Sequence, residues 1–250
     1  MEQLLEALDL CRSFYKGRKL FTAVDGVSLT LAPGEALGIV GESGSGKTTL
    51  VKMLTGLLKP DRGTILLEDR DVTAPRGEMA RFLRKRVQLV FQMPQESFDP
   101  RQTLGRGILE AMVNYGVPRS EAVRRLPALL ERCGLDAAYA NRYPHQASGG
   151  QCQRAAIARA LAVEPRLLIC DEATSALDVT VQAQVMDLLD SLRREGMAVL
   201  FISHDLALVQ EFCDRVLVLH HGCVEEEGPT EQVIGSPRSD YTRRLLDAAW

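Results

Sequence analysis

The 250-residue sequence lacks the features that mark secreted, membrane-spanning or zinc-binding chains. No apolar run reaches the roughly 18 residues of a membrane span. The first residues, MEQLLEALDL, place acids where a signal peptide has a basic segment. The six cysteines are scattered and form no CxxC pair, so we expect reduced thiols and a cytosolic compartment. The expected protein is soluble, although it can still dock on a membrane component.

An excess of charge is also missing. The chain has 30 basic and 33 acidic residues and a net charge of −3, so bulk electrostatics gives no reason to expect nucleic acid as a partner. The short basic run at 81–86 (RFLRKR) is predicted to be the solvated face of a helix. With 46% hydrophobic residues, the chain can bury the core of one large domain or two small ones.

A glycine-rich loop joins a strand candidate to a helix candidate. Residues 36–40 (ALGIV) form a short apolar run typical of a buried strand, and 47–58 has helical spacing of its leucines. Strand, glycine-rich turn and helix are the context that a phosphate-binding loop requires. The candidate nucleotide-binding residues are Gly41, Glu42, Ser43, Gly44, Ser45, Gly46, Lys47, Thr48 and Thr49.

These residue types suit a nucleotide phosphate. Glycine tolerates the backbone angles and the close approach that let successive N–H groups surround a phosphate. The positive end of the following helix adds to this attraction. Lys47 can reach β- and γ-phosphate oxygens, and the Thr48 hydroxyl can ligate Mg²⁺.

A second candidate site lies at an acidic strand end. The apolar run at 167–170 is followed by Asp171 and Glu172. An acidic pair in this position is usually a surface feature, but here it follows a phosphate-binding loop. We therefore predict that Asp171 holds Mg²⁺ through water and that Glu172 polarises the attacking water.

A second glycine-rich element comes between these two motifs. It consists of Ser148, Gly149, Gly150 and Gln151, and it opens an apolar helix predicted over 150–163. Backbone N–H groups at a helix N-terminus bind anions, and Ser148 adds a hydroxyl group. One nucleotide site needs only one such helix N-terminus, but the chain has two. The second helix N-terminus predicts that each nucleotide is shared between two chains.

Strands and helices alternate along much of the chain. Further strands are predicted at 64–68, 87–91, 199–202 and 216–220, and a helix over 179–194. Such alternation favours an α/β fold with a mainly parallel sheet. The segments 8–31 and 63–70 have the pattern of short antiparallel strands.

The middle of the chain has little strand signal and is predicted to be helical. Helices are expected over 104–115, 120–133 and 150–163. Ser120 is the expected N-cap of the second of these helices, and Gly134 its expected stop. These helices form an insert in the α/β core.

Together, these elements resemble the ATP-binding-cassette (ABC) ATPases over nearly the whole chain. GESGSGKT resembles the Walker A motif, ASGGQ the family signature and LLICDE the Walker B motif. Gln92 falls at the Q-loop, 175–178 at the D-loop and His204 at the switch histidine. The resemblance implies a P-loop NTPase (RecA-like) core with an antiparallel β-subdomain, formed by 1–92 and 165–250, and a helical signature subdomain formed by 93–164.

The resemblance also implies roles for the matching residues. ATP and Mg²⁺ are the expected cofactors, with the 41–49 loop on the phosphates and Glu172 as the base. Thr48, Gln92 and Asp171 would hold the metal, and His204 would contact the γ-phosphate. Tyr15 would stack on adenine, with Phe14 as an alternative. In the family's head-to-tail dimer, the signature binds the partner's nucleotide; its residues here are Ser148, Gly149, Gly150 and Gln151.

Three positions depart from the family pattern. Ala147 replaces the usual leucine before SGGQ, Ala173 replaces the frequent proline after the Walker B glutamate, and Cys152 follows the signature. The first two positions have apolar or backbone roles, so fine geometry is affected more than ATP binding.

Three further stretches resemble the peptide/nickel importer ATPases within this family: 91–100 (FQMPQESFDP), 176–184 (ALDVTVQAQ) and 239–246 (SDYTRRLL). This resemblance implies two separate transmembrane permeases, a second ABC ATPase that is identical or homologous, and indirectly an extracytoplasmic solute-binding protein. The chain would then lie at the cytoplasmic face of the membrane. Ala173 and the end at Trp250 favour nickel or another metal chelate modestly over di- and oligopeptides.

Two alternative functions remain open. The first is an ABC ATPase partner of a soluble complex, such as the carbon–phosphorus lyase system, which shares the DVxVQA-like stretch. The second is a P-loop kinase or GTPase. Those proteins lack SGGQ before Walker B, and no base-specifying NKxD motif is visible in this sequence.

Overall fold

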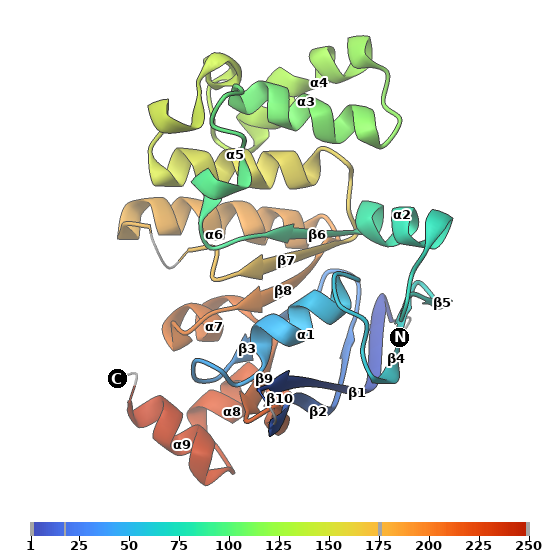
Figure 1. Ribbon diagram of the computed structural model, residues 1–250. Helices are drawn as coiled ribbons and strands as arrows, with labels where there is room; N and C mark the ends of the chain where they lie inside the picture. The colour runs from blue at the N-terminus through green and yellow to red at the C-terminus, as the bar shows by residue number, and fades with distance from the viewer. Residues whose placement is uncertain (1–2, 18, 175–176, 249–250) are drawn as a thin grey trace.

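A computed structural model describes residues 3–17, 19–174 and 177–248 (Figure 1). The strands are Leu5–Lys16 (β1), Lys19–Leu31 (β2), Ala36–Val40 (β3), Arg62–Leu67 (β4), Arg70–Asp71 (β5), Val87–Val90 (β6), Leu167–Asp171 (β7), Ala198–Ile202 (β8), Arg215–His220 (β9) and Cys223–Pro229 (β10). The α-helices are Lys47–Leu54 (α1), Gly77–Arg86 (α2), Leu104–Asn114 (α3), Arg119–Arg132 (α4), Gly149–Leu161 (α5), Val179–Arg194 (α6), Leu206–Phe212 (α7), Thr230–Gly235 (α8) and Asp240–Asp247 (α9).

A largely parallel sheet forms the centre of the described chain. Its strand order is β10-β9-β3-β8-β7-β6, and only β10 pairs antiparallel to its neighbour. Strands β3 and β8 are buried along their whole length, as expected for a sheet covered on both faces. The predicted α/β fold is confirmed. Parallel strands bring their carboxyl ends to one edge, so the segments after β3, β6, β7 and β8 meet there.

A second, antiparallel sheet packs beside the first. Its order is β2-β1-β4-β5, and α1 shares one apolar cluster with both sheets. Leu50 and Met53 of α1 are fully buried in this cluster. The helix that follows the phosphate-binding loop is therefore held by rigid elements. It ends at Leu54 rather than at Leu58, because Gly56 has a positive φ of 69°, which turns the chain out of the helix.

Helices α3, α4 and α5 gather at the top of Figure 1, where the sequence predicts a helical insert. Helices α5 and α6 run side by side over the sheet. The prediction of Ser120 as an N-cap is wrong. Helix α4 starts at Arg119 behind Pro118, whose restricted φ is already suited to a helix start. Gly134 follows the last turn of α4, as predicted.

The basic run at 81–86 lies on α2, which confirms the predicted helix. Its arginines and lysine are exposed or half-buried, whereas Leu83 is buried in the core. Phe82 packs beneath the guanidinium groups of Arg70 and Arg86. The run is therefore a solvated face with an apolar anchor.

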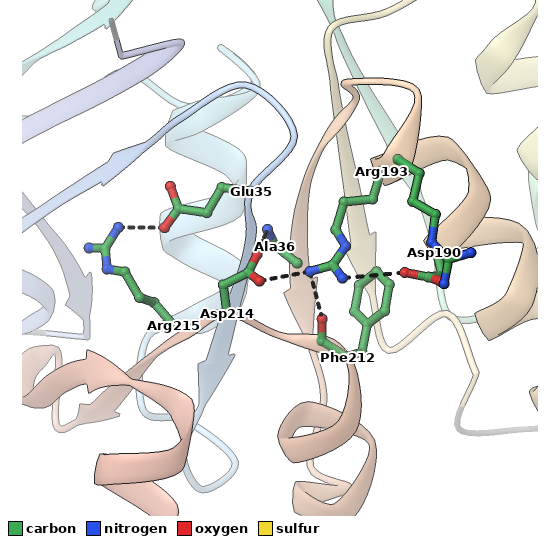
Figure 2. A network of polar contacts seen from close by, with 8 residues as sticks. Glu35, Ala36, Asp190, Arg193, Phe212, Asp214 and Arg215 are labelled. Atoms are coloured by element: carbon green, nitrogen blue, oxygen red, sulfur yellow. Dashed lines mark hydrogen bonds and ion pairs between the residues drawn. The ribbon is translucent and has the colours of Figure 1, made fainter. Parts of the chain in front are cut away.

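A network of polar contacts ties the amino ends of the central strands to α6 (Figure 2). The Asp214 carboxylate accepts one hydrogen bond from the backbone N–H of Ala36 and another from Arg193, both at 2.8 Å. Arg193 also donates to Asp190 and to the carbonyl of Phe212. The network joins β3, the start of β9 and the end of α6 at the edge of the sheet opposite the glycine-rich loop.

We expect Asp214→Ala to lower the free energy of unfolding by about 1–3 kcal/mol, because the buried N–H of Ala36 loses its acceptor. Asp214→Asn keeps an acceptor oxygen and should lose less. The matched control is Asp187→Ala, at an exposed position on α6. Urea unfolding of the three variants measures the difference, and equal stability of Asp214→Ala and the control would contradict this role.

Candidate functional site

A cavity of about 440 Å³ opens at the carboxyl edge of the central sheet. It brings together the predicted loop after β3, the acidic pair at the end of β7 and the histidine after β8. The lining residues are Phe21, Ala23, Gly41, Ser43, Gly44, Gly46, Lys47, Thr48, Thr49, Asp171, Glu172 and His204. Segments more than 100 residues apart in the sequence therefore form one site.

The glycines of the loop allow the backbone to pack closely. A Cβ atom at Gly41 would lie 2.2 Å from the carbonyl oxygen of Leu219, and one at Gly46 would lie 2.4 Å from that of Ala23. Both residues also have positive φ angles, which disfavour side chains. Ser45 is buried within the loop, whereas Glu42 is exposed and is not among the described lining residues.

The ammonium group of Lys47 lies inside the loop. Its Nζ donates to the carbonyl oxygens of Gly41 at 2.6 Å and Glu42 at 2.8 Å, and to Ser45 Oγ at 3.3 Å. Burial lowers the pKa of Lys47, although the nearby carboxylates of Glu172 and Asp171 oppose this. The partly desolvated cation favours an anionic ligand, because the ligand would restore the lost solvation.

Asp171 and Glu172 both line the cavity, although successive strand residues normally point to opposite faces. The reason is the backbone of Glu172, which has a positive φ of 49°. Such a conformation costs about 1–2 kcal/mol for a residue other than glycine. A hydrogen bond of 2.9 Å from its N–H to the carbonyl of Ile202 anchors it. Burial and the Glu172 charge raise the pKa of Asp171.

His204 approaches the acidic pair from β8. Its Nδ1 lies 3.8 Å from Oε1 of Glu172, while 65% of its side chain is exposed. The imidazole can therefore reach both Glu172 and a ligand in the cavity.

Gln92 lines a neighbouring cavity of about 490 Å³. This second cavity shares Thr48, Asp171 and Glu172 with the first. Because Gln92 also lines it, the three predicted Mg²⁺ ligands, Thr48, Gln92 and Asp171, border one cavity. Sequence reasoning missed its other lining residues, Phe91, Met93, Glu96 and Ser97. The available signal was their place after β6 in the stretch 91–100, which resembles the peptide/nickel importer ATPases.

Tyr15 lies on β1 and is 78% exposed, and it is not among the described residues that line the first cavity. Phe21 of β2 lines that cavity instead, and Phe14 lies opposite Phe21 in the strand register. Sequence reasoning missed Phe21, because only strand pairing decides which aromatic of the hairpin borders the loop. The role of Tyr15 stays a prediction.

The second glycine-rich element caps α5. The backbone N–H of Ser148 donates to Gln151 Oε1 at 2.9 Å, and the N–H of Gln151 donates to Ser148 Oγ at 3.3 Å. Gly149 is open to solvent, but a Cβ at Gly150 would lie 2.0 Å from Val181 Cγ1 of α6. None of these four residues is among the described lining of the Lys47 cavity. The structure does not bring the two glycine-rich elements together within one chain.

The residues that depart from the family pattern are buried. Ala147 and Ala173 are packed in the core, and Cys152 Sγ donates to the carbonyl of Pro144 at 3.4 Å. Burial raises the pKa of Cys152, which disfavours the thiolate form that reacts. Of the predicted D-loop, Ser175 and Ala176 lie outside the described residues.

The site suits a nucleoside triphosphate with Mg²⁺. The lysine and the backbone N–H groups of the loop match phosphate oxygens. Hydroxyl, carboxylate and amide oxygens, supplied by Thr48, Asp171 and Gln92, are the hard donors that Mg²⁺ prefers. Burial and the neighbouring Glu172 charge raise the pKa of Asp171, and a divalent cation bound there would favour its carboxylate form.

Comparisons with known proteins agree with this site. The family model described as "ABC transporter" matches residues 24–175. The chain is 44% identical over 238 residues to the oligopeptide transport ATP-binding protein OppF of Escherichia coli K12, covering 94% of this chain and 71% of that protein. It is 46% identical over 228 residues to the glutathione import ATP-binding protein GsiA of Pectobacterium atrosepticum, covering 90% of this chain and 37% of GsiA.

A solved structure shows the same fold. It is a dimer of the ATP-binding cassette MJ0796 in a post-hydrolysis state with ADP and phosphate. The TM-score is 0.83 at 29% identity, over 90% of this chain and 98% of that one. The fold, the nucleotide cavity and these relatives converge: the chain belongs to the ABC transporter family, as an ATP-binding and ATP-hydrolysing subunit.

Proposed function

We propose that the chain powers the import of peptides through separate permease subunits. The observation that carries this proposal is the single cavity that joins Lys47, Asp171, Glu172 and His204. Relatives named for oligopeptide transport and glutathione import support the proposal that ATP hydrolysis by this chain drives import. Those names favour peptides over the nickel alternative and transport over a soluble complex.

Within this proposal, each lining residue has a role. Lys47 and the loop N–H groups bind the phosphates. Thr48, Gln92 and Asp171 would hold Mg²⁺, which when bound would neutralise charge on the phosphate oxygens. Glu172 accepts a proton from water as the water oxygen bonds to the γ-phosphorus and the bond to ADP breaks. His204 contacts the γ-phosphate and, at 3.8 Å from Glu172, orients that carboxylate.

The second glycine-rich element supports a shared nucleotide. Ser148 and Gly149 sit at the open N-terminus of α5, outside the chain's own cavity. We place them, with Gly150 and Gln151, on the ATP of a second ATPase in a head-to-tail dimer. ATP shifts the dimer equilibrium because these contacts exist only in the closed state.

The helical unit 93–164 is the proposed contact with the permeases, through the groove beside Gln92. Phe91 and Met93 are exposed there and offer apolar surface to a partner. Among the described helices, none is both long and apolar enough to cross a bilayer. In this proposal the chain acts at the cytoplasmic face of the membrane, bound to two permeases. A solute-binding protein on the other side delivers the substrate to those permeases.

Co-expression of the tagged chain with candidate permease subunits provides the test. We expect the tagged chain to retain two multi-span subunits and the reconstituted complex to take up peptide only with ATP and Mg²⁺. A chelator should stop uptake. Capture of a soluble lyase core, or ATP-driven uptake of nickel alone, would overturn the proposal.

A further inference from the structure

The C-terminal helix α9 contacts the phosphate-binding loop through one hydroxyl group. Tyr241 of α9 is 5% exposed, and its Oη accepts a hydrogen bond of 3.3 Å from the backbone N–H of Glu42. Glu42 is the second residue of the loop. We infer that Tyr241 is a positioning residue that holds the start of the loop in the shape required for nucleotide binding. This inference rests on the proposed nucleotide role of the loop.

The direction of the Tyr241 hydroxyl is set by ring stacking. The ring lies on His220, the last residue of β9, with centroids 3.7 Å apart and planes inclined by 16°. The same end of β9 also packs directly against the loop. The Leu219 carbonyl lies so close to Gly41 that a Cβ atom there would be 2.2 Å from its oxygen. The N–H of Gly222 donates to the Ser45 carbonyl at 2.9 Å. The hydroxyl thus adds a third contact to a loop already held from β9.

Two carboxylates on β10 fix the first turn of α9. Ser239 caps the helix by accepting from the N–H of Tyr241 at 3.0 Å, and it donates to Glu225 at 2.5 Å. Glu226 accepts from the backbone N–H groups of Arg238 and Ser239 at 2.9 and 3.1 Å. Tyr241 therefore projects from a rigid support rather than from a loose terminal segment.

The peptide groups of Glu42 lie between Tyr241 and Lys47. The Glu42 N–H donates to Tyr241, and its carbonyl accepts from Lys47 at 2.8 Å. Loss of the hydroxyl frees this segment to rotate, so part of the binding energy of ATP must reorder it. The proposed base Glu172 directly follows β7 and is held by its own hydrogen bond to Ile202, so it keeps its place. The loss should therefore weaken binding and leave the chemical step unchanged.

The test is Tyr241→Phe in the full chain, with ATP as the ligand. We expect the KM for ATP to rise about three- to tenfold, as for one lost hydrogen bond, while kcat stays within about twofold. Exchange of the Glu42 amide hydrogen, followed by NMR without nucleotide, should become about tenfold faster. The matched control is Tyr139→Phe, whose ring packs beneath Arg142 in the helical unit; it should leave both quantities unchanged.

A second variant, Ser239→Ala, removes the cap that directs Tyr241 and should move both quantities the same way by a smaller factor. The inference is overturned if Tyr241→Phe leaves either the KM or the Glu42 exchange rate as in the wild type. A fall in Tm with an unaltered KM would assign the tyrosine a purely structural role and also overturn it. Failure of the proposed function is distinct, because capture of a soluble lyase core or ATP-driven uptake of nickel alone would not alter the effect of Tyr241→Phe on the KM and the exchange rate of the isolated chain.

Discussion

Replacement of Glu172 by Gln is expected to leave ATP binding intact and to reduce turnover by at least about 100-fold, the typical loss for a general base. The amide keeps the size of the side chain but cannot accept a proton from water. The strained backbone of Glu172 does not depend on the carboxylate, so the fold should persist. Phosphate release measured at saturating ATP gives the turnover, and nucleotide titration gives the affinity.

The matched control is Glu231→Gln, an exposed glutamate in the first turn of α8. It should hydrolyse ATP within about twofold of the wild-type rate. If Glu172→Gln does the same, Glu172 is not the base, and His204 becomes the group to examine.

Replacement of Gly149 by Glu should abolish ATP-dependent dimerisation while the single chain still binds ATP. A like charge facing the partner's triphosphate costs several kcal/mol, so the dimer constant should fall at least about 100-fold. Gly149 suits this test better than its neighbours. A Cβ atom added at Gly149 would meet nothing within 4 Å, whereas one at Gly150 would clash with Val181, and Ser148 caps α5.

The measurement is sedimentation with ATP in the Glu172→Gln background, where slow hydrolysis preserves the dimer. Gly235→Glu is the matched control, since Gly235 also has open space around it and lies on α8, away from α5. An unchanged ATP-dependent dimer in the Gly149→Glu chain would refute the shared nucleotide.

The same element shows how far sequence reasoning extends. The spacing of Ser148 to Gln151 before an apolar helix predicts an exposed helix N-terminus, and α5 begins there. The pattern does not reveal that Gly150 is required by the packing of α5 against α6. Helix packing joins residues about 30 positions apart, and no local pattern records it.

The order and type of the elements around the site follow from local sequence patterns. The apolar run of β3, the glycines after it and the lysine at the start of α1 encode the phosphate-binding loop locally. The strand that ends at Asp171 is also encoded by a local pattern, because a strand buried on both faces requires a continuous apolar run. These features depend on neighbours in the chain, so the sequence displays them.

Which side chains share a space depends instead on long-range packing. The positive φ of Glu172 turns it into the cavity beside Asp171, and a contact with β8 fixes that angle. Strand pairing selects Phe21 as the aromatic that borders the loop, and the return of α9 brings Tyr241 to Glu42. Each of these depends on chain segments far apart in sequence, which meet only because burying the two apolar clusters forces the strands into one order.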